Sequence, residues 1–109
     1  MKPFVVSVAA LIAAVSANTA LAADPAAGKK VAQGTCAVCH GLDGIAKVPD
    51  APHLAGENVE YLMRQLKAFK SGERKHEQMS IIAQSMKDED MENVSAWYSQ
   101  IQIKAEMPK

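Results

Sequence analysis

The stretch Cys36-Ala37-Val38-Cys39-His40 constrains this chain more than any other part of its sequence. It holds both cysteines of the 109 residues, with two residues between them and a histidine directly after the second. Such a cluster has four chemical uses: a disulfide, a metal site, a reactive thiol pair or covalent attachment of a cofactor. Each use needs a different surrounding fold, so the use of this cluster restricts the folds that the chain can adopt.

Covalent attachment of haem is the use that the C-x-x-C-H pattern predicts. Two thiols one short turn apart can each add to a vinyl group of the porphyrin, and the next imidazole can then ligate the iron. We therefore expect Cys36 and Cys39 to form thioether links to one haem c. We expect His40 to be an axial iron ligand. The porphyrin would also supply apolar core to a chain too short to bury much of its own.

Two rival uses fit the rest of the sequence less well. A thioredoxin-like redox pair belongs to a fold with strands, and no segment here shows strand alternation with turn signals. A structural zinc site usually has four ligands. The cluster provides three, and His53 or His76 would have to be the fourth, whereas such sites more usually carry a second clustered pair.

Residues 1–22 have the layout of a secretory signal peptide. Lys2 precedes an apolar run from Phe4 to Val15, and Ala20-Leu21-Ala22 forms the small-residue cleavage pattern. We expect cleavage after Ala22, which leaves a domain over residues 23–109. An uncleaved anchor is the alternative, but polar residues interrupt the run before it reaches the ~20 residues of a spanning helix. The expected location is the periplasm, outside the reducing cytoplasm.

The domain after the signal peptide has 87 residues and a net charge of −1. Nucleic-acid binding would need a basic stripe, so we expect no nucleic-acid partner. Helical periodicity predicts an all-α domain of three main helices, one short helix and a long loop. The expected elements are a helix from Asp24 to Gly34, a loop over 41–56, and helices over 57–72, 76–86 and 88–103. Gly28, inside the first helix, marks either a close approach of another backbone or a tolerated weak position.

An electron-transfer haem needs a second axial ligand, and methionine or histidine can provide it. Met79 and Met86 are the two methionines that lie neither on the apolar faces of the longer predicted helices nor at the ends of the chain. Met79 also belongs to a helical stripe with Ile82, Ala83 and Met86. Spacing alone therefore leaves Met79, Met86 and a histidine open as the ligand.

Three stretches together resemble the class I monohaem bacterial cytochromes c, the short periplasmic type related to the repeats of dihaem cytochromes. They are Gly28-Lys29 through CAVCHGLDG, then PHLAGENVEYLMRQLKAFKSGERK, and finally MSIIAQSMKDEDMENVSAWYS. The resemblance implies the class I fold, three main helices plus one short helix and a long loop around the haem. It covers nearly the whole expected domain.

The resemblance also implies roles for single residues. Met79 matches the axial methionine, and Pro52 matches the proline whose carbonyl accepts a hydrogen bond from the proximal histidine. Arg74 matches an arginine near the haem carboxylates. Gly28 and Trp97 match the positions where the first and last helices cross. The chain departs from the pattern at four positions, none of which removes a ligand: His53, Glu57, Met86 and Lys87. We expect His53 to be a loop or surface histidine.

The expected function is transfer of one electron between periplasmic or membrane redox proteins, which would dock weakly at the haem edge. We expect no enzymatic activity and no small-molecule substrate, because two axial ligands leave no open position on the iron. A cytochrome subunit held in a larger oxidoreductase is the alternative. A haem sensor with a weak sixth ligand is a third hypothesis, which Met79 disfavours.

The cysteine pair leads to the first prediction. If Cys36 and Cys39 form thioether links, the haem will stay with the polypeptide through denaturing gel electrophoresis, where in-gel peroxidase staining detects it. Extraction of the haem by acid-acetone would contradict covalent attachment.

Overall fold

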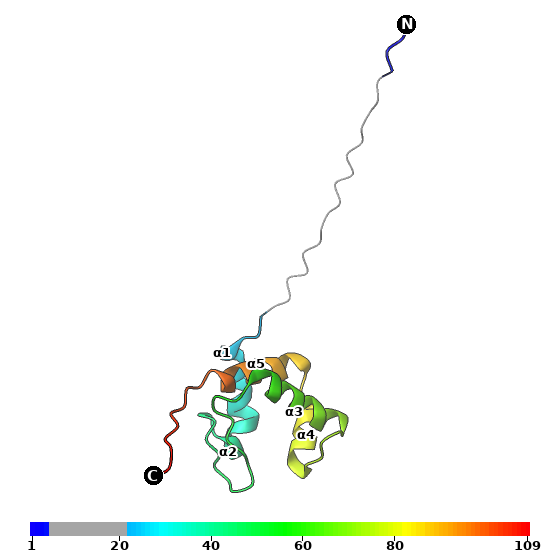
Figure 1. Ribbon diagram of the computed structural model, residues 1–109. Helices are drawn as coiled ribbons and strands as arrows, with labels where there is room; N and C mark the ends of the chain where they lie inside the picture. The colour runs from blue at the N-terminus through cyan, green and yellow to red at the C-terminus, as the bar shows by residue number, and fades with distance from the viewer. Residues whose placement is uncertain (5–21) are drawn as a thin grey trace.

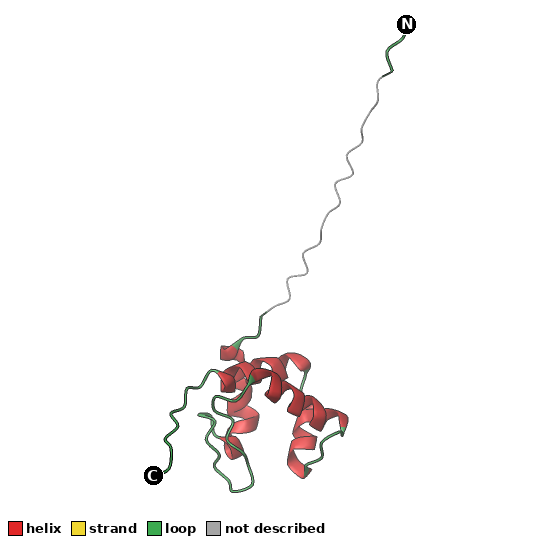
Figure 2. Ribbon diagram, in the orientation of Figure 1, coloured by secondary structure: helices red, strands yellow, loops and turns green. Residues whose placement is uncertain are grey.

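All regular structure is helical in the computed structural model, which describes residues 1–4 and 22–109 (Figures 1 and 2). The elements are α1 (Pro25–Val31), a π-helical turn η1 (Ala32–Cys36), α2 (Ala37–His40), α3 (Val59–Ser71), α4 (Glu77–Ser85) and α5 (Asp88–Ser99). The described ranges contain no strand, which confirms the all-α prediction. They also contain no helix long and apolar enough to cross a membrane. The predicted signal peptide lies almost wholly outside the described residues.

The first helical segment continues past Gly34, where the sequence predicted its end. Asp24 caps α1 as expected, and its carboxylate accepts a hydrogen bond from the Ala26 N–H at 2.9 Å. The chain then remains helical through η1 and α2 as far as His40. Gly34 does not stop it because its φ is not positive, whereas Gly41, with φ of 75°, leaves the helical range. Both cysteines and His40 therefore lie on helical backbone.

Gly28 marks the point where α1 and α5 come closest. A Cβ atom at Gly28 would lie 1.8 Å from the carbonyl oxygen of Asn93 and 2.9 Å from the backbone nitrogen of Val94. The Asn93 side chain also accepts a hydrogen bond from the Asp24 N–H at 2.8 Å. Of the two interpretations of Gly28, the close backbone approach is therefore correct. This crossing joins the two ends of the domain.

The remaining helices begin where the sequence predicted, within two residues. The Asn58 side chain caps α3, and Gly72 ends it in the left-handed conformation with φ of 84°. α5 ends at Ser99 instead of reaching residue 103, because the Tyr98 carbonyl accepts hydrogen bonds from the N–H groups of Gly56 and Ile101. The buried apolar cluster is formed by η1, α3, α4, α5 and the residue that follows α4: Ala32, Leu62, Phe69, Ala83, Met86, Met91, Val94 and Tyr98.

The predicted loop over 41–56 has no regular helix but is held by backbone hydrogen bonds. Lys47 N–H donates to the Cys39 carbonyl at 2.8 Å, and Leu54 N–H donates to the Gly44 carbonyl at 2.8 Å. The end of the loop is joined to α5 through the bond from Gly56 to Tyr98. The loop is thus an ordered part of the domain and returns the chain alongside His40.

The helix crossing leads to the second prediction. Gly28→Ala should lower the free energy of unfolding by ~1–3 kcal/mol or more, because α1 must move away from the α5 backbone to make room for the methyl group. Gly34→Ala is the matched control, since a Cβ there would meet no atom within 4 Å. The control should gain ~0.5–1 kcal/mol from its higher helix propensity. Equal effects of the two substitutions in denaturant unfolding would contradict the close approach.

Candidate functional site

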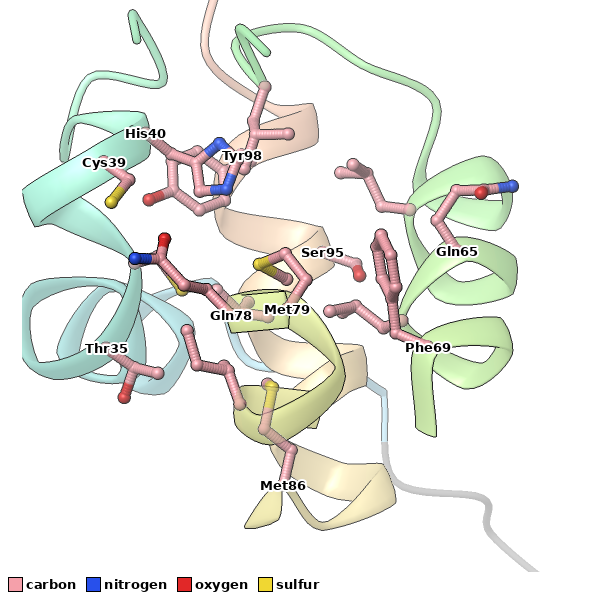
Figure 3. A pocket seen from close by; sticks show the side chains of 16 residues that line it. Thr35, Cys39, His40, Gln65, Phe69, Gln78, Met79, Met86, Ser95 and Tyr98 are labelled. Carbon is pink, nitrogen blue, oxygen red and sulfur yellow. The ribbon is translucent and has the colours of Figure 1, made fainter. Parts of the chain in front are cut away.

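One cavity brings together the four residues predicted as haem anchors and iron ligands. Cys36, Cys39 and His40 reach it from the first helical segment, and Met79 reaches it from α4 (Figure 3). The rest of its lining is mostly apolar and comes from η1, α3, α4 and its C-cap, α5 and the loop: Thr35, Leu54, Leu62, Gln65, Leu66, Phe69, Gln78, Ile82, Met86, Val94, Ser95 and Tyr98. Residues distant in the sequence thus surround one apolar space.

His40 is held in a fixed orientation at the wall of this cavity. Its ring is buried, and its Nδ1 lies 2.9 Å from the carbonyl oxygen of Pro52, to which it can only donate. This bond assigns the Nδ1–H tautomer and leaves the Nε2 lone pair free for a metal ion. The predicted hydrogen-bond partner of His40 is therefore in place.

The environment of Cys36 does not suit a reactive thiol. Both cysteine side chains are free and partly buried. Burial raises the pKa of the Cys36 thiol to about 11, and a nearby Tyr98 hydroxyl opposes this only in part. A nucleophilic cysteine needs a lowered pKa instead. Cys36 is thus a neutral thiol at neutral pH.

Two neighbouring side chains of α5 hold the backbone that follows His40. The Tyr98 hydroxyl donates to the Gly41 carbonyl at 2.9 Å, and the Trp97 Nε1–H donates to the Leu42 carbonyl at 3.0 Å. Burial is the main cause that raises the pKa of Tyr98, with smaller effects from Cys36 and Asp43. The phenol therefore remains a hydrogen-bond donor at all physiological pH values.

Met79 and Met86 occupy different parts of the cavity. Met79 lies in the first turn of α4 and is partly exposed, whereas Met86 is the C-cap residue after this helix and has an extended backbone, with φ of −83° and ψ of 140°. Met79 lines both the main cavity and a second cavity beside it, whereas Met86 lines only the first and is 6% exposed in the apolar cluster. Figure 3 shows Met79 nearer to His40 in this view, and Met86 farther along.

Neither remaining histidine lies in the main cavity. The His53 Nδ1 accepts a hydrogen bond from the Ala46 N–H at 2.8 Å, which makes it an exposed loop histidine as expected. The His76 Nδ1 caps α4 by accepting from the Met79 N–H at 3.2 Å. Among the described residues no group of three or more His, Cys, Asp or Glu side chains could hold a metal ion. The zinc hypothesis therefore lacks a site in this part of the chain.

Pro52 and Arg74 line the second cavity, which shares Cys39 and Met79 with the first. The Arg74 guanidinium donates to Gln65 Oε1 at 2.6 Å, and its central carbon lies 4.5 Å from the centre of the Phe69 ring. The guanidinium is thus held at the side of the site where Pro52 lies. A cation so placed can pair with a carboxylate.

The residues present fit a large apolar group bound by an imidazole and a thioether. The main cavity has no charged side chain in its lining and is walled mainly by aliphatic and aromatic carbon. One buried hydroxyl in it, Ser95 Oγ, has no hydrogen-bond partner within the described residues. Sequence reasoning missed Ser95 and Tyr98 as lining residues. No signal in the sequence distinguishes Ser95 from an exposed serine beside the apolar stripe of α5.

Comparison with known proteins points to one family. The model of the family described as "Cytochrome c" matches residues 25–102. Cytochrome c4 of Thiocapsa roseopersicina is 41% identical over 76 residues, which cover 70% of this chain and 39% of that protein. Cytochrome c-554(548) of Halomonas halodenitrificans is 41% identical over 81 residues, which cover 72% of this chain and 96% of that protein. The chain thus spans about two fifths of the first relative and nearly all of the second.

A solved structure has the same helical arrangement. Cytochrome c4 of Acidithiobacillus ferrooxidans, described as supporting "a complex-induced tuning of electron transfer", superposes with a TM-score of 0.66 and 31% identity. The match covers 75% of this chain and 52% of that one. The similarity in sequence and in structure therefore extends over most of the described helices.

The Tyr98 hydrogen bond leads to the third prediction. Tyr98→Phe should lower the free energy of unfolding by ~1–3 kcal/mol, because the buried Gly41 carbonyl loses its donor. Tyr61→Phe removes a hydroxyl from an exposed side chain of α3 and should change stability by less than ~0.5 kcal/mol. Denaturant unfolding of the two variants measures the difference, and an effect of Tyr98→Phe as small as that of the control would show that the bond contributes little.

Proposed function

Because the chain belongs to the cytochrome c family, we propose that it carries one electron at a time on a single haem held by its C-x-x-C-H motif. Covalently bound haem c with its iron is the cofactor of this family. The relatives named above are electron carriers and not enzymes. The observation that supports the proposal most strongly is the apolar cavity that Cys36, Cys39, His40 and Met79 all line.

Each of these residues has a proposed role. Cys36 and Cys39 would hold the haem through thioether links, His40 would ligate the iron through Nε2, and Met79 would provide a second ligand to the iron. The haem iron supplies the one-electron change between its ferric and ferrous states. Pro52 orients the His40 ring through its carbonyl, which also raises the basicity of the imidazole. Arg74 pairs with haem carboxylate groups on the side of the second cavity.

The surrounding side chains favour the reduced state. An apolar wall without charged groups makes extra positive charge costly, and so opposes oxidation of the iron. The thioether of Met79 is a soft ligand that acts in the same direction. The buried ring of His40 and the hydrogen bonds of Tyr98 and Trp97 hold the proximal side, so this side needs little rearrangement when the electron is gained or lost.

The proposed location is the periplasm, after removal of residues 1–22 by cleavage between Ala22 and Ala23. The proposed partners are periplasmic or membrane redox proteins that dock weakly at the haem edge. The description of the Acidithiobacillus cytochrome c4 structure, in which a complex tunes electron transfer, supports a protein partner for a relative with this fold. Mass spectrometry of the purified protein tests the cleavage site.

A free carrier and a subunit of a larger oxidoreductase differ in size in solution. In gel filtration of a native extract, a carrier should elute alone at ~9 kDa, because a weakly docking partner dissociates on dilution. Co-elution with a dehydrogenase at every dilution would identify the chain as a subunit and contradict the free carrier.

The assignment of Met79 leads to the fourth prediction. Met79→Ala should remove the weak sulfur-to-iron absorption band of the ferric protein at the red end of the spectrum and lower the midpoint potential, because the iron loses its soft ligand. Met86→Ala, at the C-cap of the same helix, is the matched control and should keep the band while losing ~2–4 kcal/mol of stability from the apolar cluster. Loss of the band in the Met86 variant instead would overturn the ligand assignment.

A further inference from the structure

The first turn of α4, which carries Met79, is closed by hydrogen bonds that meet at His76. The His76 Nδ1 accepts from the Met79 N–H at 3.2 Å, and the Ser80 Oγ accepts from the His76 N–H at 3.0 Å. The His76 carbonyl also accepts from the Ser80 N–H at 2.9 Å, which is the first bond of the helix. The side chain and the backbone of one residue thus hold the turn that contains Met79.

Histidine is an uncommon residue at a helix N-cap, where Asn, Asp, Ser and Thr are preferred. Its ring is larger, and here it makes a second contact. The ring centres of His76 and Phe69 lie 6.4 Å apart, with an angle of 71° between the ring planes. This edge-to-face arrangement is favourable between aromatic rings. Phe69 belongs to α3 and lines the main cavity, so the capping ring joins the start of α4 to the cavity wall.

α4 depends on such contacts because it is short. It has nine residues, and an isolated helix of this length is marginal in water. At its far end, the Lys70 Nζ of α3 donates to the carbonyl of the C-cap residue Met86. Met79 lies at the near end, where helices fray unless their first N–H groups find acceptors. Since His40 lies on a separate segment, α2, fraying of this turn would change the separation of the two proposed iron ligands.

We propose that His76 is a positioning residue that keeps Met79 on the iron by capping the first turn of α4. This inference rests on the proposed function, in which the Met79 sulfur is an iron ligand. His76 acts through the backbone of the turn: the cap opposes opening of the turn, and the closed turn keeps the sulfur within reach of the metal. Loss of the cap should therefore make the sulfur easier to displace, while the folded protein and its haem remain.

The test measures how readily added imidazole replaces the sulfur on the ferric iron, because imidazole can bind there only after Met79 has left. Wild type, His76→Ala, His76→Asn and Asn58→Ala are compared in haem-loaded form at one mildly alkaline pH. His76→Ala removes the cap, and the association constant for imidazole should rise about two- to thirtyfold, the effect of one lost N-cap on the opening of a helix end. His76→Asn provides an acceptor that is preferred at N-caps and should stay near the wild-type value.

Asn58→Ala is the matched control. Asn58 is also an exposed N-cap residue, it accepts from the N–H groups of Glu60 and Tyr61, and its helix carries no proposed iron ligand. The control should unfold at lower denaturant concentration but keep the imidazole association constant within about twofold of wild type. Amide hydrogen exchange gives a second readout: the Met79 N–H should exchange faster in His76→Ala and at the wild-type rate in the control.

Three results would overturn the proposal. One is an unchanged imidazole association constant in His76→Ala. Another is an equal rise in His76→Ala and Asn58→Ala, which would assign the effect to general loss of stability. The third is a His76→Asn protein that resembles His76→Ala, which would assign the effect to the imidazole ring, a neighbour of Arg74 in the second cavity, and not to the cap. Failure of the proposed function is recognised separately, because the wild-type protein would then lack covalent haem or the sulfur-to-iron band.

Discussion

Two hydrogen bonds from α5 to the backbone after His40 join the beginning of the domain to its end. Tyr98 and Trp97 are neighbours in the sequence, and they bind the consecutive carbonyls of Gly41 and Leu42. With the close approach at Gly28, they place the first helical segment against α5. The cavity exists because α3 and α4 then close its other side. The chemistry of the cysteine motif therefore depends on contacts with residues almost sixty positions away.

Much of this fold could be predicted from the sequence, because local signals and tertiary contacts agree. α3 has apolar residues at helical spacing, a capping Asn58 and a left-handed Gly72, and it lies where these signals predict. The wrong predictions concern two helix ends, where the same residues are compatible with more than one backbone conformation. Gly34 looks like a helix stop, yet only its φ angle decides, and the helix continues. The end of α5 depends on the Tyr98 carbonyl, which accepts a hydrogen bond from the N–H group of Gly56 in a loop distant in sequence.

The residues of the candidate site also differ in whether the sequence could predict them. Cys36, Cys39 and His40 are predicted as haem anchors and iron ligand by their spacing alone, because covalent attachment and ligation need adjacent residues. Spacing could not separate Met79 from Met86, since the sequence places both on one predicted helical stripe, and the preference for Met79 came from the family resemblance. In the structure the helix ends at Ser85, one residue before Met86. Ser95 was not predictable as a cavity residue: a serine beside an apolar stripe shows neither that it is buried nor that its hydroxyl lacks a partner.

In the proposed haem-loaded protein, the iron has a histidine on one face and a methionine on the other. X-ray absorption spectroscopy at the iron edge of the purified protein tests this ligand pair most directly, because it identifies the atoms bound to the metal. We expect a single sulfur ligand beside the nitrogen ligands of the porphyrin and of His40, in both oxidation states. A shell of nitrogen or oxygen alone, or a vacant position on the iron, would contradict this ligand pair.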